Sequence, residues 1–132
     1  MDDTEATEKV SNPGTRNIGS LLVVGTGAGT MPLLTHEAAV AIRAADVVVG
    51  YRTYNNQLRR LFPEKEYVDG AMGAEIKRCR QALDLAREGR VVAMVSSGDP
   101  GVYGMAGPIL EMADDVPVTI IPGVSAAQIA AA

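Results

Sequence analysis

Short apolar runs alternate with amphipathic stretches from residue 20 onward. Four runs have the length and aliphatic content of buried strands, and they cover residues 21–24, 46–49, 90–95 and 116–121. Residues 66–68 are a weaker signal for a further strand, which is third along the chain. Between most of these runs, apolar residues recur at helical spacing. Strands that alternate with helices predict an α/β fold, with a mostly parallel five-stranded sheet and helices on both of its faces.

The first two predicted helices are short. Thr35 can cap a helix whose apolar stripe consists of Ala38, Ala41, Ile42 and Ala45. A second helix is predicted over residues 53–62, where Pro63 ends it and where Arg59 and Arg60 point outward. The small alanines of the first helix favour close packing against the sheet.

The stretch over residues 74–88 has the clearest helical pattern, and Gly89 can end it. Its apolar stripe consists of Ile76, Cys79, Leu83 and Ala86. The opposite face is charged and includes Arg78, and Arg80 is spaced to pair with Asp84 one turn later. We expect this face to be solvated, and we expect Cys79 to belong to the core rather than to react.

Two further helices are predicted toward the end of the chain. One covers residues 105–112, and Ser125 with Gln128 forms a capping box that opens the other at Ala126. Residues 1–19 are polar and are expected to form a flexible tail. Residues 20–132 are therefore expected to form one α/β domain, truncated at the start of its last helix.

Composition and charge narrow the classes of function. Apolar residues make up 47% and charged residues 21% of the chain, as in globular domains, and the net charge of −4 gives no reason to expect nucleic acid or an anionic membrane as partner. Cys79 is the single cysteine, and no signal or membrane-spanning pattern occurs, so a cytoplasmic location is expected. His36 is the single histidine and is expected at the surface, so no metal site is predicted.

The apolar run over residues 90–95 leads into a loop rich in glycine, Ser96-Ser97-Gly98-Asp99-Pro100-Gly101-Val102-Tyr103-Gly104. Loops at the carboxyl ends of parallel strands are where α/β proteins bind ligands. Glycines let the backbone approach a ligand, and Asp99 adds an acceptor suited to hydroxyl and amino donors such as those of an adenosine. The alternative, that Asp99 caps a helix and the glycines form a tight turn, stays open.

The loop after the first strand, Gly25-Thr26-Gly27-Ala28-Gly29-Thr30, is a weaker signal. A dinucleotide fingerprint needs glycine or alanine where Thr30 stands, and an acidic residue after the second strand, where Gly50, Tyr51 and Arg52 are found. No Gly-Lys-Ser/Thr ending of a P-loop occurs. These features count against NAD(P) binding.

Three stretches occur in a characteristic order: residues 24–29 with 33–35, the central Ser97-Gly98-Asp99-Pro100, and residues 121–126. Together they resemble the tetrapyrrole (corrin/porphyrin) methyltransferase family, and the resemblance spans residues 21–132. Residues 45–54, 70–75 and 96–106 further resemble the precorrin-3B C17-methyltransferase subgroup of that family. Several matches in one order are more specific than a single glycine motif.

The resemblance implies that S-adenosyl-L-methionine binds in a cleft between this domain and a second domain that the chain lacks. It implies cofactor contacts at Ser97, Gly98, Asp99, Val102, Ser125 and Ala126. The first loop is implied to face the tetrapyrrole, with Gly27 and Gly29 as substrate-binding residues. Ala28 stands where the family usually has proline and is counted with the cofactor-binding residues, and Thr30 replaces an acidic residue.

The implied reaction is methylation of C17 of precorrin-3B, or of its cobalt form, with contraction of the macrocycle. A sulfonium methyl donor is already activated, so no protein nucleophile is needed and no catalytic residue is assigned. Because a tetrapyrrole carries many carboxylates, Arg52 at a strand's carboxyl end is the best-placed residue to bind it. An ordinary surface arginine is the alternative reading of Arg52.

Three interpretations of the whole chain remain open. It is an S-adenosylmethionine-dependent methyltransferase, present as a fragment or as a half completed by a separate chain; an inactive remnant or interaction module of the same fold; or, less favoured, an NAD(P)-binding domain. The surface that would face the absent domain should expose apolar area. We therefore expect a homodimer or association with the missing carboxyl-terminal half.

Overall fold

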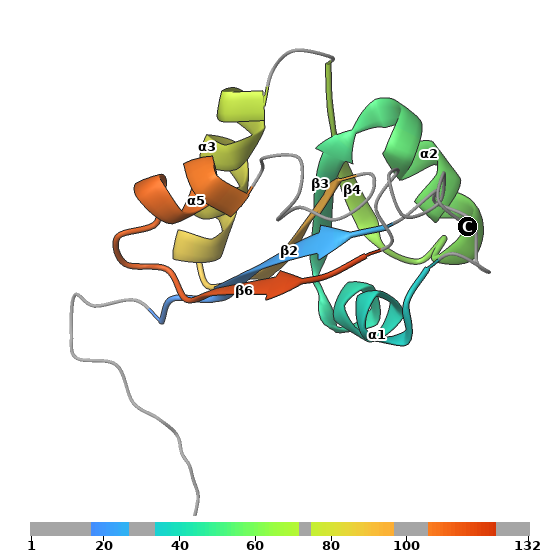
Figure 1. Ribbon diagram of the computed structural model, residues 1–132, viewed down its shortest axis with the longest axis horizontal. Helices are drawn as coiled ribbons and strands as arrows, with labels where there is room; N and C mark the ends of the chain where they lie inside the picture. Colours follow the sequence, from blue (N-terminus) through green and yellow to red (C-terminus); the bar gives the residue numbers. More distant parts are fainter. Residues whose placement is uncertain (1–16, 27–33, 72–74, 97–105, 124–132) are drawn as a thin grey trace, which may run out of the picture.

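The computed structural model in Figure 1 describes residues 17–26, 34–71, 75–96 and 106–123. Its elements follow the order strand, helix, strand along the chain. They are β2 (Ser20–Gly25), α1 (His36–Ala44), β3 (Val47–Tyr51), α2 (Arg52–Leu61), β4 (Glu66–Gly70), α3 (Glu75–Arg87), β5 (Val91–Ser96), α5 (Ala106–Met112) and β6 (Val118–Ile121). Of the tail predicted over residues 1–19, residues 1–16 lie outside the described residues, as does the helix predicted at Ser125. Gly19 differs from the expected free tail, because its backbone N–H donates to the carbonyl of Ala86 at 2.8 Å.

The strands form one five-stranded sheet in the order β4-β3-β5-β2-β6. Every described pair is parallel, with Val47 opposite Val92 and Leu22 opposite Ala93 in the registers. All five strands therefore end at the same edge of the sheet. The predicted α/β fold with a parallel sheet is confirmed.

Helices cover both faces of this sheet (Figure 1). α1 and α2 pack on one face against Val48, Ala93 and Val95, and α3 and α5 pack on the other against Val47 and Met94. Successive residues of β3 alternate between the two clusters because strand side chains point to opposite faces in turn. The fully buried valines of β3 therefore pack against the helices on both faces of the sheet.

The helix termini follow the sequence signals closely. The Thr35 hydroxyl accepts a hydrogen bond from the backbone N–H of Ala38 at 3.0 Å, which confirms the predicted cap of α1. Gly89, just beyond α3, has φ +98°, a conformation in which a side chain would be strained. Helix α3 ends there because glycine adopts this turn at little cost.

The predicted faces of α3 are partly wrong. Ile76 was assigned to the apolar stripe but is 48% exposed, whereas Arg78, assigned to the solvated face, is only 7% exposed. The core side of the helix is centred on Cys79, Ala82 and Ala86, so Ile76 lies at its margin. Asp84 pairs with Arg87 at 3.3 Å instead of with Arg80.

Arg59 also departs from the prediction. It was expected to point outward from the second helix, but its Nη2 lies 2.9 Å from Asp69 Oδ1, and its guanidinium lies 4.8 Å from the centre of the Tyr67 ring. Arg60 is exposed as expected. The difference arises because β4 ends beside α2 and offers a carboxylate there, which the local sequence of the helix does not reveal.

Candidate functional site

The carboxyl edge of the sheet is the candidate site. The chain continues from β2 to α1 on one face and from β5 to α5 on the other, although β2 and β5 are neighbours. Adjacent strands whose connections diverge to opposite faces open a crevice, and α/β proteins bind ligands in such crevices. The backbone N–H and hydroxyl of Thr26 both donate to the carbonyl of Ser96 at 2.9 Å, which joins the two strand ends.

Most of the predicted site residues lie just beyond the described strand ends. Residues 27–29 follow Thr26, residues 97–102 follow Ser96, and residues 125–126 follow the exit of β6. The cofactor contacts of Ser97, Gly98, Asp99, Val102, Ser125, Ala126 and Ala28, and the substrate contacts of Gly27 and Gly29, are thus outside the described residues and stay predictions. The structure brings the segments that lead to them to one edge.

Ser96 carries an unsatisfied hydroxyl at the origin of the central loop. Its Oγ is buried and is one of two buried side-chain atoms in the described part of the chain that have no hydrogen-bond partner. A buried polar group without a partner is costly unless a ligand or water satisfies it. The position therefore fits a polar ligand at this edge.

Arg52 is the predicted site residue whose surroundings the structure describes. It begins α2 directly after β3 ends at Tyr51, and it is exposed. With Tyr51, Thr53, Gly70 and Ala71 it lines a cavity of about 340 Å³ at the ends of β3 and β4. Tyr51 makes no side-chain cap, and the first turn of α2 has no acidic residue. The positive charge of Arg52 helps to lower the pKa of Asp69, so one carboxylate of the chain lies within electrostatic reach of Arg52.

Asn55 was missed by the sequence analysis. It is a fully buried residue on the inner face of α2. Its Nδ2 donates to the carbonyls of Gly50 (3.2 Å) and Val68 (3.1 Å) and to Asp69 Oδ1 (2.9 Å). These bonds tie together the ends of β3 and β4, beside the Arg52 cavity. A signal was available, because Asn55 shares a helical stripe with Leu58 and Phe62, at spacings of three and four.

The close approach of Asn55 to β3 needs a glycine. A Cβ atom on Gly50 would lie 2.5 Å from Val95 Cγ2 and 2.7 Å from Asn55 Oδ1. Asn55 Oδ1 is itself the second buried atom without a partner in the part of the chain that is described. The absence of a side chain at Gly50 therefore leaves the space that the Asn55 side chain occupies against β3.

The charges around Asp69 are balanced. Burial of its carboxyl favours the neutral form, but hydrogen bonds from Asn55 and Arg59 and the charge of Arg59 outweigh burial and lower the pKa of Asp69. Burial, assisted by the negative charge of Glu64, raises the pKa of Tyr67 to about 12. Near neutral pH, Asp69 is therefore charged and the Tyr67 hydroxyl is neutral. The charged Asp69 holds Asn55 and Arg59 in place through hydrogen bonds.

The Asp69→Asn variant is expected to lose more stability near neutral pH than in acid. Since the pKa of Asp69 is lower in the folded chain than in the unfolded one, its stabilising contribution is full above the unfolded value of about 4 and is lost as pH falls through the folded value. Urea unfolding of both proteins at about pH 7 and about pH 3 measures this. A stability difference that is independent of pH would contradict the assignment.

Arg78 holds the far wall of the Arg52 cavity. Its Nη1 donates to the carbonyl of Ala71 at 2.6 Å, its Nη2 lies 4.0 Å from Glu75, and its stem lies against Gly70, where a Cβ would approach within 2.5 Å of Arg78 Cδ. Both Gly70 and Ala71 line the cavity. The buried guanidinium therefore fixes backbone that a ligand of the cavity would meet.

Cys79 and His36 lie where the sequence indicated. Cys79 is fully buried in the core, and burial raises the pKa of its thiol, which lowers its reactivity. His36 is exposed at the start of α1. Among the described residues, no cluster of three acidic, histidine or cysteine side chains could hold a metal ion, and no helix is long and apolar enough to cross a bilayer.

The fold and its edge define a doubly wound α/β domain with a candidate ligand site beyond its strand ends. Comparison with known families assigns this domain more narrowly. The model of the tetrapyrrole (corrin/porphyrin) methylases matches residues 20–132, and the chain belongs to this family. The family resemblance inferred from the sequence is confirmed, and the match disfavours an NAD(P)-binding domain.

Individual relatives point to one branch of the family. The chain is 44% identical over 115 residues to a probable cobalt-factor III C(17)-methyltransferase of Salmonella typhimurium, which covers 84% of the chain and 48% of that relative. It is 40% identical over 115 residues to a precorrin-3B C(17)-methyltransferase of Sinorhizobium sp, covering 82% of the chain and 45% of the relative. The chain thus spans about half the length of these curated relatives.

A solved structure agrees with this placement. The crystal structure of the methyltransferase CobJ matches with a TM-score of 0.76 and 35% sequence identity, over 86% of this chain and 49% of that one. The likeness confirms the fold of the described domain.

Proposed function

We propose that this chain forms the amino-terminal half of an S-adenosyl-L-methionine-dependent methyltransferase of cobalamin biosynthesis. The proposed reaction is methylation of C17 of precorrin-3B, or of its cobalt form, coupled to ring contraction, in the cytoplasm. The observation that carries the proposal is the joined carboxyl edge of β2 and β5, from which the first loop and the Gly-Asp-Pro loop both depart. The names of the relatives support the choice of reaction.

The residues of this half bind and orient the reactants. The donor, once bound, supplies an activated methyl group, so the protein needs to align it with the ring carbon and to exclude water. Asp99 accepts hydrogen bonds from the donor's hydroxyl or amino groups, and the backbone of Ser97 and Gly98 lies against it. The buried, unpartnered Ser96 hydroxyl fits a polar ligand at this place.

Arg52 is proposed to bind a carboxylate side chain of the tetrapyrrole. No acidic side chain is among the residues that line the cavity beside it, and α2 begins at Arg52, so the amide dipoles of the helix add to its positive potential. Guanidinium groups bind carboxylates through paired hydrogen bonds. In this arrangement S-adenosyl-L-methionine binds at the crevice between β2 and β5. A carboxylate side chain at the edge of the tetrapyrrole lies toward β3, at Arg52.

Replacing Arg52 by glutamine is expected to raise KM for the tetrapyrrole about tenfold with little change in kcat, because a uniform binding contact is lost. The measurement is steady-state kinetics with the complete polypeptide that the gene encodes. Arg60→Gln, an exposed arginine at the other end of the same helix, is the matched control. If both variants keep the parent's KM, Arg52 is an ordinary surface residue.

Calorimetric titration of the complete polypeptide tests the proposal as a whole. S-adenosylhomocysteine is expected to bind with a stoichiometry of about one per chain, while NADP releases no binding heat. Binding of NADP alone would instead support a dinucleotide-binding domain. Binding of neither would indicate an inactive remnant or an interaction module of the same fold.

The remaining wall of the cleft is proposed to come from a second half of similar length. The support is that the relatives extend to about twice the matched length. A homodimer of this half is the alternative arrangement. Mixing with a separately produced carboxyl-terminal half distinguishes them, because a complementing half raises the affinity for S-adenosylhomocysteine and a homodimer does not respond.

A further inference from the structure

Two tyrosines flank Arg52 and form an aromatic contact with each other. Tyr51 ends β3, and Tyr54 lies in the first turn of α2. Their ring centres are 5.5 Å apart at an interplanar angle of 80°, which is the edge-to-face arrangement that aromatic pairs prefer. Tyr51 also lines the cavity of about 340 Å³ at Arg52. Tyr54 therefore braces an aromatic residue of the cavity wall.

The structure explains the other aromatic residues that it describes by packing. Phe62 is 2% exposed in the core, and the Tyr67 hydroxyl donates to the carbonyl of Phe62 at 2.7 Å while its ring lies against Arg59. Tyr51 and Tyr54 are instead half-buried, and neither hydroxyl has a hydrogen-bond partner among the described residues. Tyrosines of this kind suit contacts with ligands that have both apolar and polar parts.

The cavity places an aromatic ring beside a guanidinium group. An edge-to-face pair occupies at most one face of the Tyr51 ring, so Tyr54 leaves the other face uncovered. A flat conjugated ring that carries carboxylates satisfies both groups, because the ring stacks on Tyr51 and a carboxylate pairs with Arg52. A volume of about 340 Å³ is at the small end of ligand sites, which suits one ring of a macrocycle with its side chains.

The adenine of the methyl donor is a second flat ring that could reach this edge of the sheet. The donor also carries a sulfonium and an ammonium group, and the positive charge of Arg52 disfavours both. The crevice proposed for the donor lies between β2 and β5, whereas Tyr51 ends β3, which lies on the other side of β5. A ring of the tetrapyrrole therefore fits the cavity better than adenine does.

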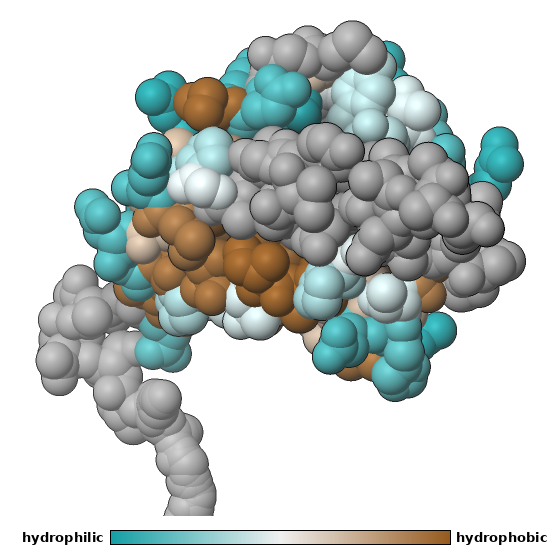
Figure 2. Space-filling view, viewed as in Figure 1, coloured by the Kyte–Doolittle hydropathy of each residue, from teal (hydrophilic) through white to brown (hydrophobic). Residues whose placement is uncertain are grey.

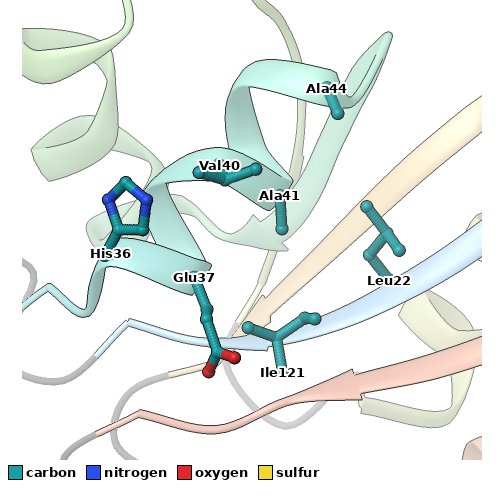
Figure 3. A pocket seen from close by; sticks show the side chains of 7 residues that line it. All are labelled: Leu22, His36, Glu37, Val40, Ala41, Ala44 and Ile121. Carbon is teal, nitrogen blue, oxygen red and sulfur yellow. The ribbon is translucent and has the colours of Figure 1, made fainter.

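An apolar groove beside α1 is the competing place for a flat ring. Figure 3 shows the side chains around this space of about 400 Å³, which include Val40, Ile121 and Glu37. Figure 2 shows hydrophobic surface over β6 and neighbouring β2. Glu37 repels carboxylates, and this groove shares no described residue with the Arg52 cavity. A ring that bears carboxylates is thus expected at Arg52 and not at the groove.

We propose that Tyr51 is a substrate-contact residue whose ring stacks on one ring of the tetrapyrrole while Arg52 binds a carboxylate of that same ring. Tyr54 is a positioning residue that holds the Tyr51 ring in place. This inference rests on the proposed function, because it takes a tetrapyrrole as the substrate. It extends that function by making the cavity selective for a conjugated ring with carboxylates over a flexible carboxylate of similar charge.

Titration of the complete polypeptide with uroporphyrin, a stable tetrapyrrole that carries carboxylates, tests the contact through the absorbance of the macrocycle. Tyr51→Leu is expected to raise the dissociation constant about 5- to 10-fold, because an aromatic contact is lost. Tyr51→Phe keeps the ring and is expected to change it less than about twofold. Tyr54→Leu should weaken binding less than Tyr51→Leu, and Tyr54→Phe should restore the parent's affinity.

Val40→Gln is the control for adsorption to the apolar groove, since Val40 is 49% exposed there, and it should bind uroporphyrin as the parent does. The affinity for S-adenosylhomocysteine, measured for each variant, should stay at the parent's value. The inference is overturned if Val40→Gln weakens uroporphyrin binding as much as Tyr51→Leu. A parallel loss of S-adenosylhomocysteine affinity in Tyr51→Leu also overturns it, because the ring would then serve the donor or the fold.

The same titrations separate this inference from the proposed function. If the parent binds S-adenosylhomocysteine but not uroporphyrin, or if Tyr51→Leu binds uroporphyrin as tightly as the parent, the stacking contact is wrong and the methyltransferase assignment stands. An equal loss in Tyr51→Phe and Tyr51→Leu would assign the contact to the hydroxyl and reject stacking. A parent protein that binds neither molecule would reject the proposed function itself, and the inference with it.

Discussion

Asn55→Ala is expected to lower the free energy of unfolding by about 2–4 kcal/mol, the largest loss of stability that we expect from a single polar substitution. The variant leaves a cavity under α2 and removes three hydrogen bonds, so that the carbonyls of Gly50 and Val68 lose their side-chain donor. Asp69 loses one of the donors that hold its pKa low. Urea unfolding followed by circular dichroism measures the change.

Asn56→Ala is the matched control, because Asn56 is the next residue of α2 and is exposed. Its side chain accepts one hydrogen bond, from Arg59, at the surface, and its loss should change stability by no more than about 0.5 kcal/mol. Equal effects of the two substitutions would show that the buried network contributes nothing beyond helix propensity. The same result would remove Asn55 as a support of the Arg52 cavity.

The elements were predictable because local signals and burial agree. Most of the predicted strands are apolar runs, and the order β4-β3-β5-β2-β6 buries the valines of β3 on both faces, as a continuous run requires. The strand at residues 66–68 has a weaker pattern, and β4 lies at the edge of the sheet with no fully buried residue. The Thr35 cap and the Gly89 turn are local features that act within a few residues. Such signals do not depend on which strand comes to lie beside which.

The errors arose where the partner of a residue belongs to another element or to the loop beyond it. Arg78 is buried because Gly70 leaves room for its stem and Ala71 offers a carbonyl, and helical periodicity contains neither fact. Arg59 turns inward because Asp69 comes to lie beside α2. A charged residue is assigned to solvent by pattern alone, since burial of a charge is costly unless a partner is present. The position of the partner is known only when the arrangement of the strands and helices is known.

These contacts between elements meet at one side of the candidate site. Asn55 joins the ends of β3 and β4, Arg78 holds Ala71, and Arg52 lies between them at the cavity. Asn55 and Arg78 hold backbone atoms of the cavity wall, and such side chains position a site rather than donate or accept protons in it. Hydrogen bonds from Asn55 and Arg78 therefore connect several segments around Arg52, where the sequence suggested an ordinary loop and helix start.

Asp99→Ala is expected to weaken S-adenosylhomocysteine binding to the complete polypeptide about 10- to 100-fold, because hydrogen bonds between a charged acceptor and a ligand contribute more than neutral ones. Asp99→Asn keeps one acceptor oxygen and should lose less. Asp114→Ala, at an exposed position outside the site edge, should bind as the parent does. Isothermal titration measures all three affinities.

The same variants separate the cofactor role of Asp99 from a capping role. An aspartate that caps a helix contributes about 1 kcal/mol to folding, and its loss would lower stability while leaving affinity unchanged once the protein is folded. An aspartate that binds the ligand gives the opposite result, because its hydrogen bonds are made to the ligand and not to its own chain. Its loss then lowers the affinity and leaves the stability of the ligand-free protein unchanged. A drop in unfolding midpoint with unchanged affinity in Asp99→Ala would therefore assign the residue to its own helix. A loss of affinity at constant stability would instead place the aspartate at the donor, beside the Ser96 hydroxyl that has no other partner.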